Sequence, residues 1–343
     1  HQKRLLPGKQ CYFPGIFFQA RLICLPSGVK KYLYKKVKNP ISFRKVNMLQ
    51  SLNSTMESMR TISLGDKSLL DNLNSLNPSD SCERSFAVNF IWRGGGEYPF
   101  TQWRDRAVFF DTRANFILYP IGGDTSPAEL SELFAEFSAH SLDAKFVYDV
   151  PPDYPKKFPG VSEFFRVEES PDDFDYIYDA QKLLDLRGGI LRKKRNHIKH
   201  FDSLNPNWTQ EPITSANLPE ARDFMESLAM PNEIQPLSRA FSFFGELPID
   251  GIILRGENGK IAAAAIMGAL NPQMYSVHFE KSDKNSEGAA QKIVSLESSH
   301  IIGKGASLMN REQDLGLENL RKAKHSLDPL RLYKRLKLVP LFK

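Results

Sequence analysis

One segment of the chain shows the clearest alternation of apolar and polar residues. Its apolar side chains recur at i, i+3, i+4 and i+7, the spacing that lines one face of an amphipathic helix. They are Leu130, Leu133, Phe134 and Phe137. The four residues before them, Ser126-Pro127-Ala128-Glu129, combine a capping box with a proline at the first helical position. The pattern therefore predicts a helix that begins at Pro127.

Similar reasoning predicts five more helices. They span about residues 63–76, 180–204, 217–228, 288–302 and 317–326. The second of them contains Gly188-Gly189, and we expect it to bend there because glycine is a poor helix former. The third opens on Asn217-Leu218-Pro219-Glu220, which is another capping signal.

Short apolar runs predict the strands. They lie at about residues 107–110, 116–119, 145–150, 252–254, 260–270, 274–280 and 306–312. Gly259 falls between two of these runs and predicts a hairpin turn. Residues 86–92 are apolar and aromatic and precede a turn at Gly94-Gly95-Gly96. Residues 151–175 are rich in Pro, Asp and Phe, a composition typical of a linker or a long crossover.

Both halves of the chain mix helices with strands that are often adjacent. This pattern predicts an α+β fold with two lobes of similar build. The length of 343 residues also suits two domains. We place a first lobe at residues 48–175 and a second lobe, with the main motifs, at residues 176–343. Hydrophobic residues make up 41% of the chain and charged residues 25%, the balance of an ordinary globular protein.

The positive charge of the chain is concentrated at its beginning. Residues 1–48 hold eleven Lys or Arg and no Asp or Glu. The remainder has 35 basic and 40 acidic residues and is mildly acidic. The chain starts with His1, and Met48 opens a segment that reads like an ordinary protein start. We expect residues 1–47 to be a basic extension, disordered or not native, and a targeting or nucleic-acid-binding arm is the alternative.

Several classes of protein do not fit this sequence. No apolar stretch approaches the roughly 20 residues needed to cross a bilayer. The three cysteines form no disulfide framework, and the seven histidines show no metal-ligand spacing. A nucleophile elbow, a Walker loop and a Rossmann fingerprint are missing as well. We expect a soluble, cytoplasmic protein with no metal and no integral membrane segment.

A run of basic residues at positions 187–200 holds no acidic residue. In a helix, Leu191, Ile198 and Phe201 would share one stripe, with Lys194 in the middle of it. An ammonium group on an apolar face is costly unless it has a partner. Lys194 therefore either meets a carboxylate or phosphate in a site, or extends past the edge of the core. The run suits a phosphate-rich ligand such as tRNA, or it is a solvated helix face.

A second polar cluster follows the last predicted strand. Asn310, Glu312 and Asp314 would lie on one face of an extended chain. Arg321 and Lys324 would share a face of the next helix, from which they could meet these carboxylates. The cluster is either an active-site wall with a carboxylate base or a salt-bridge network that ties strand to helix.

A third candidate is the loop between the strand at 274–280 and the next helix. A loop that enters a helix N-terminus can hold phosphate with its backbone N–H groups. Asn285, Gly288 and Ala290 would be the defining positions of such a phosphate loop. An ordinary helix entry is the alternative.

Several segments, in this order, resemble the C-terminal domain family of the phosphatidylglycerol lysyltransferases. They are Ser85-Phe86 with Asn89 and Trp92, Lys194 to Ile198 with Phe201, Phe279-Glu280-Lys281, Asn310 to Gly316, Leu320 to Lys324 with Ser326 and Pro329, and Tyr333-Lys334. The resemblance covers about residues 60–340. It implies two tandem GNAT-like lobes, related to the Fem peptidyltransferases, in a soluble branch of the family. Membrane-bound relatives move lysine or alanine from aminoacyl-tRNA to phosphatidylglycerol.

The resemblance implies an acyl or aminoacyl transferase. We expect aminoacyl-tRNA as the donor and an amine or hydroxyl of unknown identity as the acceptor. Glu312 or Asp314 would act as general base, Lys194 would hold donor phosphate or the developing oxyanion, and Tyr333 would protonate the leaving group. The residues expected to bind or position substrate are Arg195, Asn196, Glu280, Lys281, Asn310, Arg311, Arg321 and Lys324.

Two alternatives stay open. The first is a CoA-dependent N-acyltransferase with acyl-CoA as donor. The pyrophosphate loop of CoA-using relatives reads Arg or Gln, x, x, Gly, x, Gly or Ala, and here Asn285 stands at its first position. The second is a module without catalytic activity that binds tRNA or another phosphate-rich ligand.

Overall fold

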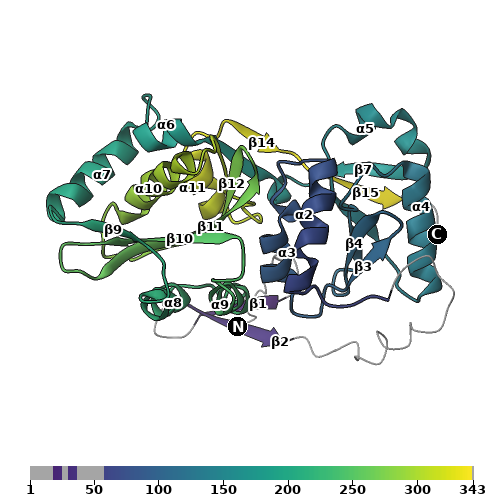
Figure 1. The fold of residues 1–343 in the computed structure, drawn as a ribbon, viewed down its shortest axis with the longest axis horizontal. Coiled ribbons are helices and arrows are strands. Elements are labelled where there is room, and N and C mark those ends of the chain that lie inside the picture. The colour runs from purple at the N-terminus through teal and green to yellow at the C-terminus, as the bar shows by residue number, and fades with distance from the viewer. Residues whose placement is uncertain (1–17, 25–29, 37–57, 342–343) are drawn as a thin grey trace, which may run out of the picture.

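The computed structural model describes residues 18–24, 30–36 and 58–341 (Figure 1). Two strands, β1 (Phe18–Cys24) and β2 (Lys30–Lys36), form an antiparallel hairpin within the basic N-terminal part. The other residues of the predicted extension at 1–47 lie outside the described residues. From residue 58 onward the chain builds two sheets with helices packed on them, so the predicted α+β fold of two lobes is confirmed.

The first lobe is built on a six-stranded sheet of order β3-β4-β5-β6-β15-β7. Its strands are β3 (Phe100–Trp103), β4 (Arg106–Asp111), β5 (Phe116–Leu118), β6 (Phe146–Val150), β7 (Phe165–Glu169) and β15 (Leu336–Pro340). β5 and β6 are parallel, and the other neighbours are antiparallel. The sheet is therefore mixed.

The second lobe is built on a seven-stranded sheet of order β14-β8-β13-β12-β11-β10-β9. Its strands are β8 (Asp175–Asp179), β9 (Thr209–Pro212), β10 (Ile249–Arg255), β11 (Ile261–Asn271), β12 (Met274–Ser282), β13 (Leu308–Asn310) and β14 (Arg331–Tyr333). Only the β12–β13 pair is parallel in this sheet. The predicted hairpin turn at Gly259 joins β10 to β11.

The chain crosses between the two sheets twice. It leaves the first sheet after β7 and enters the second at β8, close to the predicted boundary between residues 175 and 176. It returns at the end, because β15 inserts between β6 and β7. The C-terminal strand therefore belongs to the first sheet. The division of the chain into lobes at residues 48–175 and 176–343 stays a prediction.

Four α-helices and several 3-10 turns accompany the first sheet. The helices are α2 (Lys67–Leu76), α3 (Phe86–Arg93), α4 (Pro127–Ala139) and α5 (Tyr154–Lys157). The turns are η1 (Leu64–Asp66), η2 (Cys82–Arg84), η3 (Pro159–Glu163) and η4 (Pro171–Asp173). The capping box that predicted α4 is present, since Ser126 and Glu129 each accept a backbone N–H of the other. The apolar run at 86–92 is the helix α3.

Six helices accompany the second sheet. They are α6 (Ala180–Asp185), α7 (Arg192–Leu204), α8 (Leu218–Ser227), α9 (Ile234–Ser242), α10 (Ala289–Gly303) and α11 (Glu318–His325). α10 packs beside α6 and α7, and α8 and α9 lie at the lower side of Figure 1. Among the described residues, no helix combines the length and the apolar character that crossing a membrane requires.

Three predicted elements differ from the structure. The helix expected at 180–204 is two helices, because α6 ends at Leu186 in the left-handed conformation. The stretch at 151–175 is not a plain linker, because it contains α5, η3, β7 and η4. The strand expected at 306–312 covers only Leu308–Asn310.

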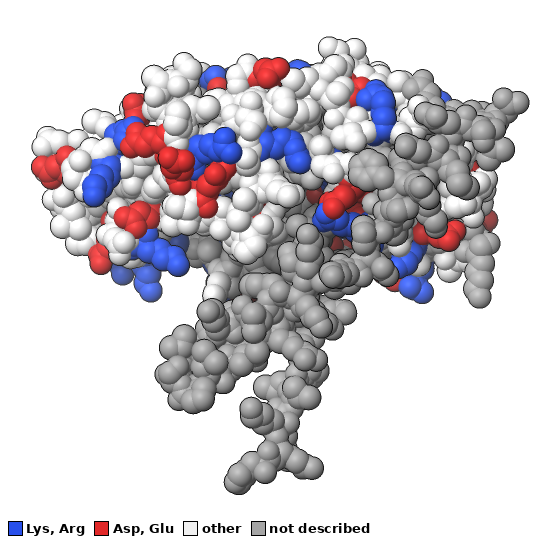
Figure 2. Space-filling model, turned by 90° about the horizontal axis from the view of Figure 1, so that it is seen from below, with Lys and Arg blue, Asp and Glu red and all other residues white. Residues whose placement is uncertain are grey.

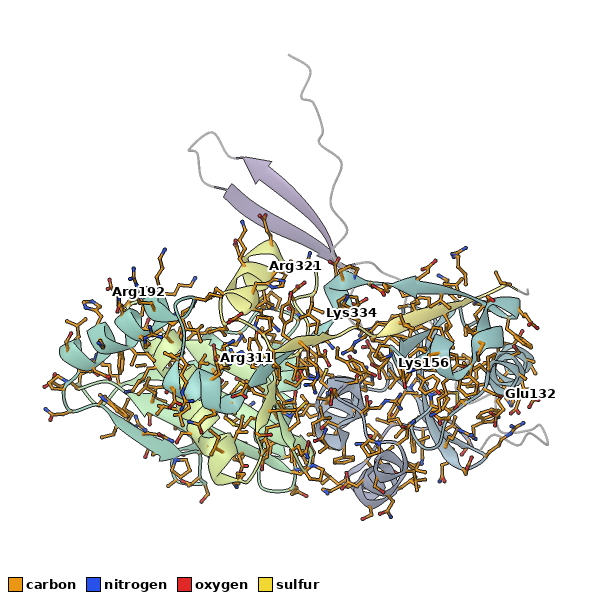
Figure 3. The ribbon with its side chains drawn as sticks, turned by 90° about the horizontal axis from the view of Figure 1, so that it is seen from above. Glu132, Lys156, Arg192, Arg311, Arg321 and Lys334 are labelled. Carbon is orange, nitrogen blue, oxygen red and sulfur yellow. The ribbon has the colours of Figure 1, made fainter. Side chains whose placement is uncertain are left out.

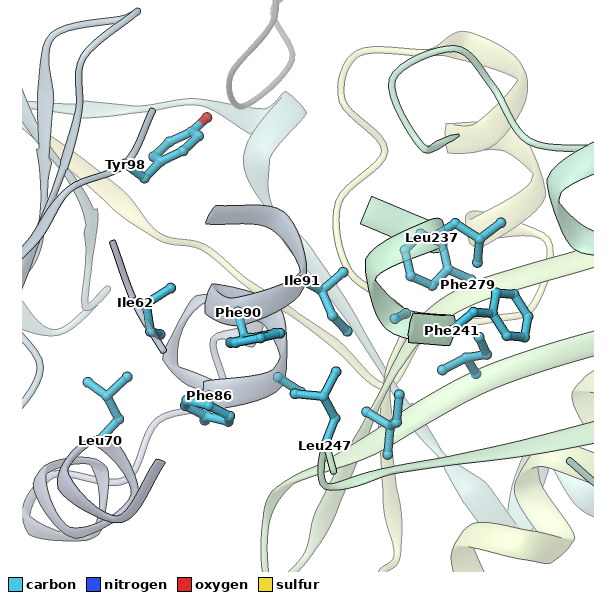
Figure 4. Packing of buried hydrophobic residues seen from close by; sticks show 14 of the residues in the cluster. Ile62, Leu70, Phe86, Phe90, Ile91, Tyr98, Leu237, Phe241, Leu247 and Phe279 are labelled. Atoms are coloured by element: carbon cyan, nitrogen blue, oxygen red, sulfur yellow. The ribbon is translucent and has the colours of Figure 1, made fainter. Parts of the chain in front are cut away.

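The two lobes share one apolar core. α3 of the first lobe packs against α9 of the second, and the cluster around them draws residues from both sheets. Figure 4 shows Phe86, Phe90 and Ile91 on one side of this contact and Leu237 and Phe241 on the other. Burial of apolar surface stabilises a protein by roughly 25 cal/mol per Å². The shared core therefore holds the lobes together and keeps the polar residues between them in place.

Candidate active site

Polar residues gather where two parallel strands of the second sheet separate. β12 and β13 pair only over Met274–Ser276 and Leu308–Asn310. β12 continues to Ser282, whereas β13 ends. The segment that follows β13 contacts β12 there through Arg311 and Glu312.

The segment after β13 turns instead of staying extended. Glu312 and Leu315 adopt the left-handed conformation, with φ of 56° and 55°, a region that residues other than glycine rarely occupy. Asn310, Glu312 and Asp314 consequently point to three different sets of partners. The expectation that they share one face of an extended strand is wrong.

Lys324 of α11 explains why the segment turns. Its ammonium group donates hydrogen bonds to the backbone carbonyls of Arg311, Glu312 and Gln313, the last two at 3.0 and 2.7 Å. Three consecutive carbonyls can converge on one cation only if the backbone curls around it. Burial and the Arg311 guanidinium lower the pKa of Lys324 to about 8. The expectation that Lys324 meets the carboxylates is wrong, because it meets backbone oxygens.

Asp314 is enclosed by hydrogen-bond donors. Arg321 donates to both of its carboxylate oxygens at 2.8 Å, and the Tyr176 hydroxyl donates at 2.6 Å. The backbone N–H of Gly316 adds a fourth hydrogen bond, at 2.9 Å. Burial alone would raise the pKa of Asp314, but the hydrogen bonds from Arg321 and Tyr176 outweigh it and keep the pKa low. This carboxylate ties α11 to β8 and offers no free oxygen for proton transfer.

Glu312 has a different environment. Its Oε1 accepts the hydroxyl of Ser276 and faces Nδ1 of His278, both at 3.0 Å. The Glu312 side chain is 15% exposed, whereas that of His278 is fully buried. The backbone N–H of Glu312 donates to Oδ1 of Asn310 at 2.6 Å. One carboxylate oxygen is thus held by β12, and the residue reaches the surface.

Arg311 points to the opposite side of the segment. Its guanidinium donates to Glu280 of β12 and to Glu297 of α10, both at 2.6 Å. Burial raises the pKa of the Glu297 carboxyl well above its usual value, and the neighbouring Glu280 adds to the rise. Arg311, Glu280 and Glu297 therefore form an ion-pair cluster that joins β12 to α10.

A second buried cluster lies between the lobes. Arg335, which precedes β15, contacts carboxylates from three segments, Glu83 at 3.2 Å, Asp149 at 3.3 Å, and Asp175. Asn310 donates to the same Asp175 at 3.0 Å. Burial raises the pKa of Asp175 to about 6 although Arg335 opposes the rise. Asn310 thus joins the end of β13 to the junction of the lobes.

The basic run forms α7, on the outer side of the second lobe (Figure 1). Lys194 is half-buried, and burial lowers the pKa of its ammonium group. It forms no hydrogen bond or ion pair with the part of the chain that the structure describes. Arg195 donates to the carbonyls of Leu186 and Gly188, the latter at 2.9 Å, and so closes the loop before α7. Asn196 is exposed.

The predicted phosphate loop enters α10. Asp283 accepts the backbone N–H of Asn285 at 3.0 Å, so this loop donor is already occupied by a carboxylate. Gly288 has φ of 84°, and a Cβ there would lie 2.2 Å from the carbonyl oxygen of His197. A glycine is required at position 288 because α7 and α10 approach each other closely there. Ala290, half-buried in the first turn of α10, completes the predicted triplet.

The remaining predicted site residues lie apart from Glu312. Tyr333 is buried, its hydroxyl accepts a hydrogen bond from Ser79 at 3.1 Å, and burial raises its pKa. It lines a hollow of about 450 Å³ beside β14. Lys281 pairs with Glu233 at the start of α9, at 2.7 Å.

The predicted site residues therefore do not form one site. Figure 3 shows Arg311, Arg321 and Lys334 near the middle of the molecule and Arg192 on the second lobe, away from the junction. The structure brings together Glu280, the residues from Asn310 to Asp314, and the helix α11. It does not join Lys194 or Tyr333 to them.

Sequence reasoning missed His278, Ser276 and Arg335. Ser276, His278 and Glu280 alternate along an otherwise apolar strand, and this alternation is the signal that could have pointed to the first two. Arg335 has no comparable signal, because its partners are distant in sequence. Within the described residues, no three His, Cys, Asp or Glu side chains are grouped so as to hold a metal ion.

A family model described as "Phosphatidylglycerol lysyltransferase, C-terminal" matches residues 75–336 of the chain. No curated protein sequence matches the chain. Among solved structures, a conserved protein of unknown function from Bacteroides thetaiotaomicron is 27% identical, with a TM-score of 0.74. The match covers 82% of this chain and 99% of that protein.

Two less similar structures share the fold. L-PGS from Bacillus licheniformis is 14% identical, with a TM-score of 0.56 over 80% of this chain and 91% of its own. A GNAT-family acetyltransferase from Colwellia psychrerythraea is 11% identical, with a TM-score of 0.50 over 84% of this chain and 100% of its own. The predicted GNAT-like character of the two lobes is confirmed.

Proposed function

The chain belongs to the family of phosphatidylglycerol lysyltransferase C-terminal domains, and on this premise we propose that it moves an aminoacyl group from aminoacyl-tRNA to an amine or hydroxyl acceptor. Its fold is of the acyltransferase type, and the family supports acyl or aminoacyl transfer. The donor, the acceptor and the residue roles below are the proposal. A donor of this kind fits the cytoplasmic location expected from the sequence.

Two separate features carry the proposal, a partly exposed carboxylate at Glu312 and a helix, α7, with exposed Lys and Arg side chains that form no ion pair among the described residues. Glu312 keeps one oxygen without a hydrogen-bond partner among the described residues and is partly exposed. A carboxylate with this freedom can accept the proton of an attacking amine or hydroxyl. Asp314, the other predicted base, is occupied by four donors. We therefore assign the role of general base to Glu312 alone.

The donor side of the proposal rests on α7. Arg192, Lys193 and Lys199 are exposed and form no ion pair within the described residues. The run has no acid until Asp202. On the face shown in Figure 2, by contrast, Lys and Arg side chains lie beside Asp and Glu side chains, with no large area of one sign. Unopposed cations along a helix attract the phosphates of RNA and release its counterions.

Acyl-CoA is the less supported donor. A CoA pyrophosphate would need free backbone N–H groups at the start of α10. In the loop before this helix, Asp283 already accepts the backbone N–H of Asn285, and Glu287 adds a second carboxylate. Two negative charges beside the loop oppose a further anion. For this reason aminoacyl-tRNA stands first.

The test supplies the purified chain with bulk tRNA that carries a mixture of labelled amino acids. Cell extract serves as the source of acceptor, and the label that leaves tRNA is followed into products. We expect protein-dependent transfer, which Glu312→Gln reduces at least 100-fold because general bases contribute about 10²–10⁴. Glu318→Gln, an exposed residue of α11, is the control and keeps full activity. Transfer that Glu312→Gln leaves intact would refute the assignment of the base.

A second arm tests the role of α7 by salt-dependent tRNA binding. Arg192→Gln, Lys193→Gln and Lys199→Gln together should weaken binding and lower the salt slope by about 2–3. The control combines Lys145→Gln, Lys156→Gln and Arg166→Gln, which change the charge equally on the first lobe. Equal loss in both triple variants would contradict a tRNA site on α7. Binding without transfer of any amino acid would instead identify a module without catalytic activity.

A further inference from the structure

His278 occupies an unusual position on β12. The register of β11 and β12 shifts between the pairs Met267–Val277 and Ile266–Phe279, so His278 is the extra residue of a β-bulge. Bulges re-aim a side chain and are over-represented next to active sites. Here the ring is fully buried and its Nδ1 faces Glu312 at 3.0 Å, whereas Nε2 has no hydrogen-bond partner in the described part of the chain.

A glycine makes room for this ring. A Cβ at Gly268 of β11 would lie 3.0 Å from Nε2 of His278 and 2.9 Å from the carbonyl oxygen of Pro248. Any larger residue would displace the ring or the backbone. A glycine in the interior of a strand is usually unfavourable because it has no side chain to pack. The space that Gly268 leaves for the imidazole of His278 is therefore a specific feature of the sheet.

We propose that His278 is a positioning residue for Glu312, a role that rests on the proposed function and extends it. The ring carries a proton on Nδ1 and donates a hydrogen bond from it to Oε1 of Glu312. Together with the Ser276 hydroxyl, it fixes this oxygen and leaves Oε2 to face the acceptor. Because the ring is buried, it holds the base and does not itself touch the substrate.

The reaction that this arrangement serves is balanced without a further reactant. The acceptor nitrogen or oxygen forms a bond to the ester carbonyl carbon of the aminoacyl-tRNA. Oε2 of Glu312 takes the acceptor proton as that bond forms. The ester C–O bond then breaks, and the released ribose oxygen takes that proton from Oε2 of Glu312, so the products are the aminoacylated acceptor and free tRNA. Glu312 returns to its ionised form.

Two substitutions of His278 separate positioning from packing. The side-chain amide of His278→Asn places an N–H close to the position of Nδ1, whereas His278→Gln is nearer in size to histidine but places its N–H near Nε2. Positioning predicts that the Asn variant keeps activity within about 10-fold of wild type and that the Gln variant loses about 100-fold in kcat. A packing role predicts the reverse order, and that order would overturn the proposal.

A second measurement is independent of activity and also of whether the proposed donor is correct. The ring nitrogens of His278 in the ¹⁵N-labelled wild-type chain report their protonation directly at pH 8. A proton on Nδ1 supports the proposal, and a ring that carries its proton on Nε2 overturns it. If the ring has the expected tautomer and no tRNA donor is used, the proposed function fails while the positioning of Glu312 stands.

Discussion

Replacement of Lys324 by methionine should unravel the turn that carries Glu312. The two side chains have similar length, but Lys324→Met removes the ammonium group that three backbone carbonyls share. A buried carbonyl left without a donor costs about 1–3 kcal/mol, so the three together cost about 6 kcal/mol. Lys324 is buried, and water would reach these oxygens only if the segment opened.

Part of this cost is offset because methionine brings no charge into the protein. The fall of the Lys324 pKa from 10.5 to about 8 corresponds to roughly 3 kcal/mol, at about 1.4 kcal/mol per pKa unit. This is the penalty for keeping the ammonium group in its buried position. The net loss in the free energy of unfolding is therefore about 3 kcal/mol.

Urea unfolding at pH 7 measures this loss, and amide hydrogen exchange locates it. We expect faster exchange over residues 311–316 in Lys324→Met. The matched control is Lys322→Met on the same helix, where the side chain is exposed and pairs with Glu318. An exposed i,i+4 pair contributes about 0.3–0.5 kcal/mol. If both variants lost the same stability, or if Lys324→Met lost less than about 1 kcal/mol, the role assigned to the three carbonyls would be refuted.

Two further predictions concern the packing of α7 and the junction of the lobes. Gly288→Ala should lower the free energy of unfolding by about 3 kcal/mol in a urea titration. Left-handed strain contributes about 1–2 kcal/mol of this, and the rest comes from a Cβ that would lie 2.2 Å from the His197 carbonyl oxygen. The control is Gly303→Ala, which has open space around it and should not lower the stability. Asp175 has a folded-state pKa raised from 3.8 to about 6, so the folded state binds this proton more tightly and the associated stability is lost as pH rises from about 4 to above 6. Relative to Asp175→Asn, the wild type should lose about 3 kcal/mol over that interval, and a pH-independent difference between the two would show that the carboxyl is not perturbed by its burial beside Arg335.

Much of the fold could be predicted because its signals are local. The capping box before α4 and the apolar spacing within it lie in a dozen consecutive residues. Propensity and periodicity act over this range. The strands β10, β11 and β12 were also recognisable, since they are long, apolar and joined by short turns. The short strands β3, β9, β14 and β15 were missed because they depend on partners elsewhere in the chain.

The candidate site was recognised in composition but not in geometry. The polar run from Asn310 and its resemblance to the family pointed to the right segment. An extended strand was nevertheless the wrong conformation, because Lys324 draws three carbonyls onto one cation. The choice between Glu312 and Asp314 also needed the structure, since Arg321 and Tyr176 reach the second carboxylate from other elements.

The sequence by itself determined the class of fold, the positions of the long helices and central strands, the basic character of α7 and the family. Each of these follows from residues that are neighbours in the chain or from motifs in a given order. Only the tertiary structure decided that β15 returns to the first sheet, that Arg335 gathers three carboxylates between the lobes, and that His278 faces Glu312. Those contacts join residues far apart in sequence, and their energies depend on burial and direction, which no local pattern records.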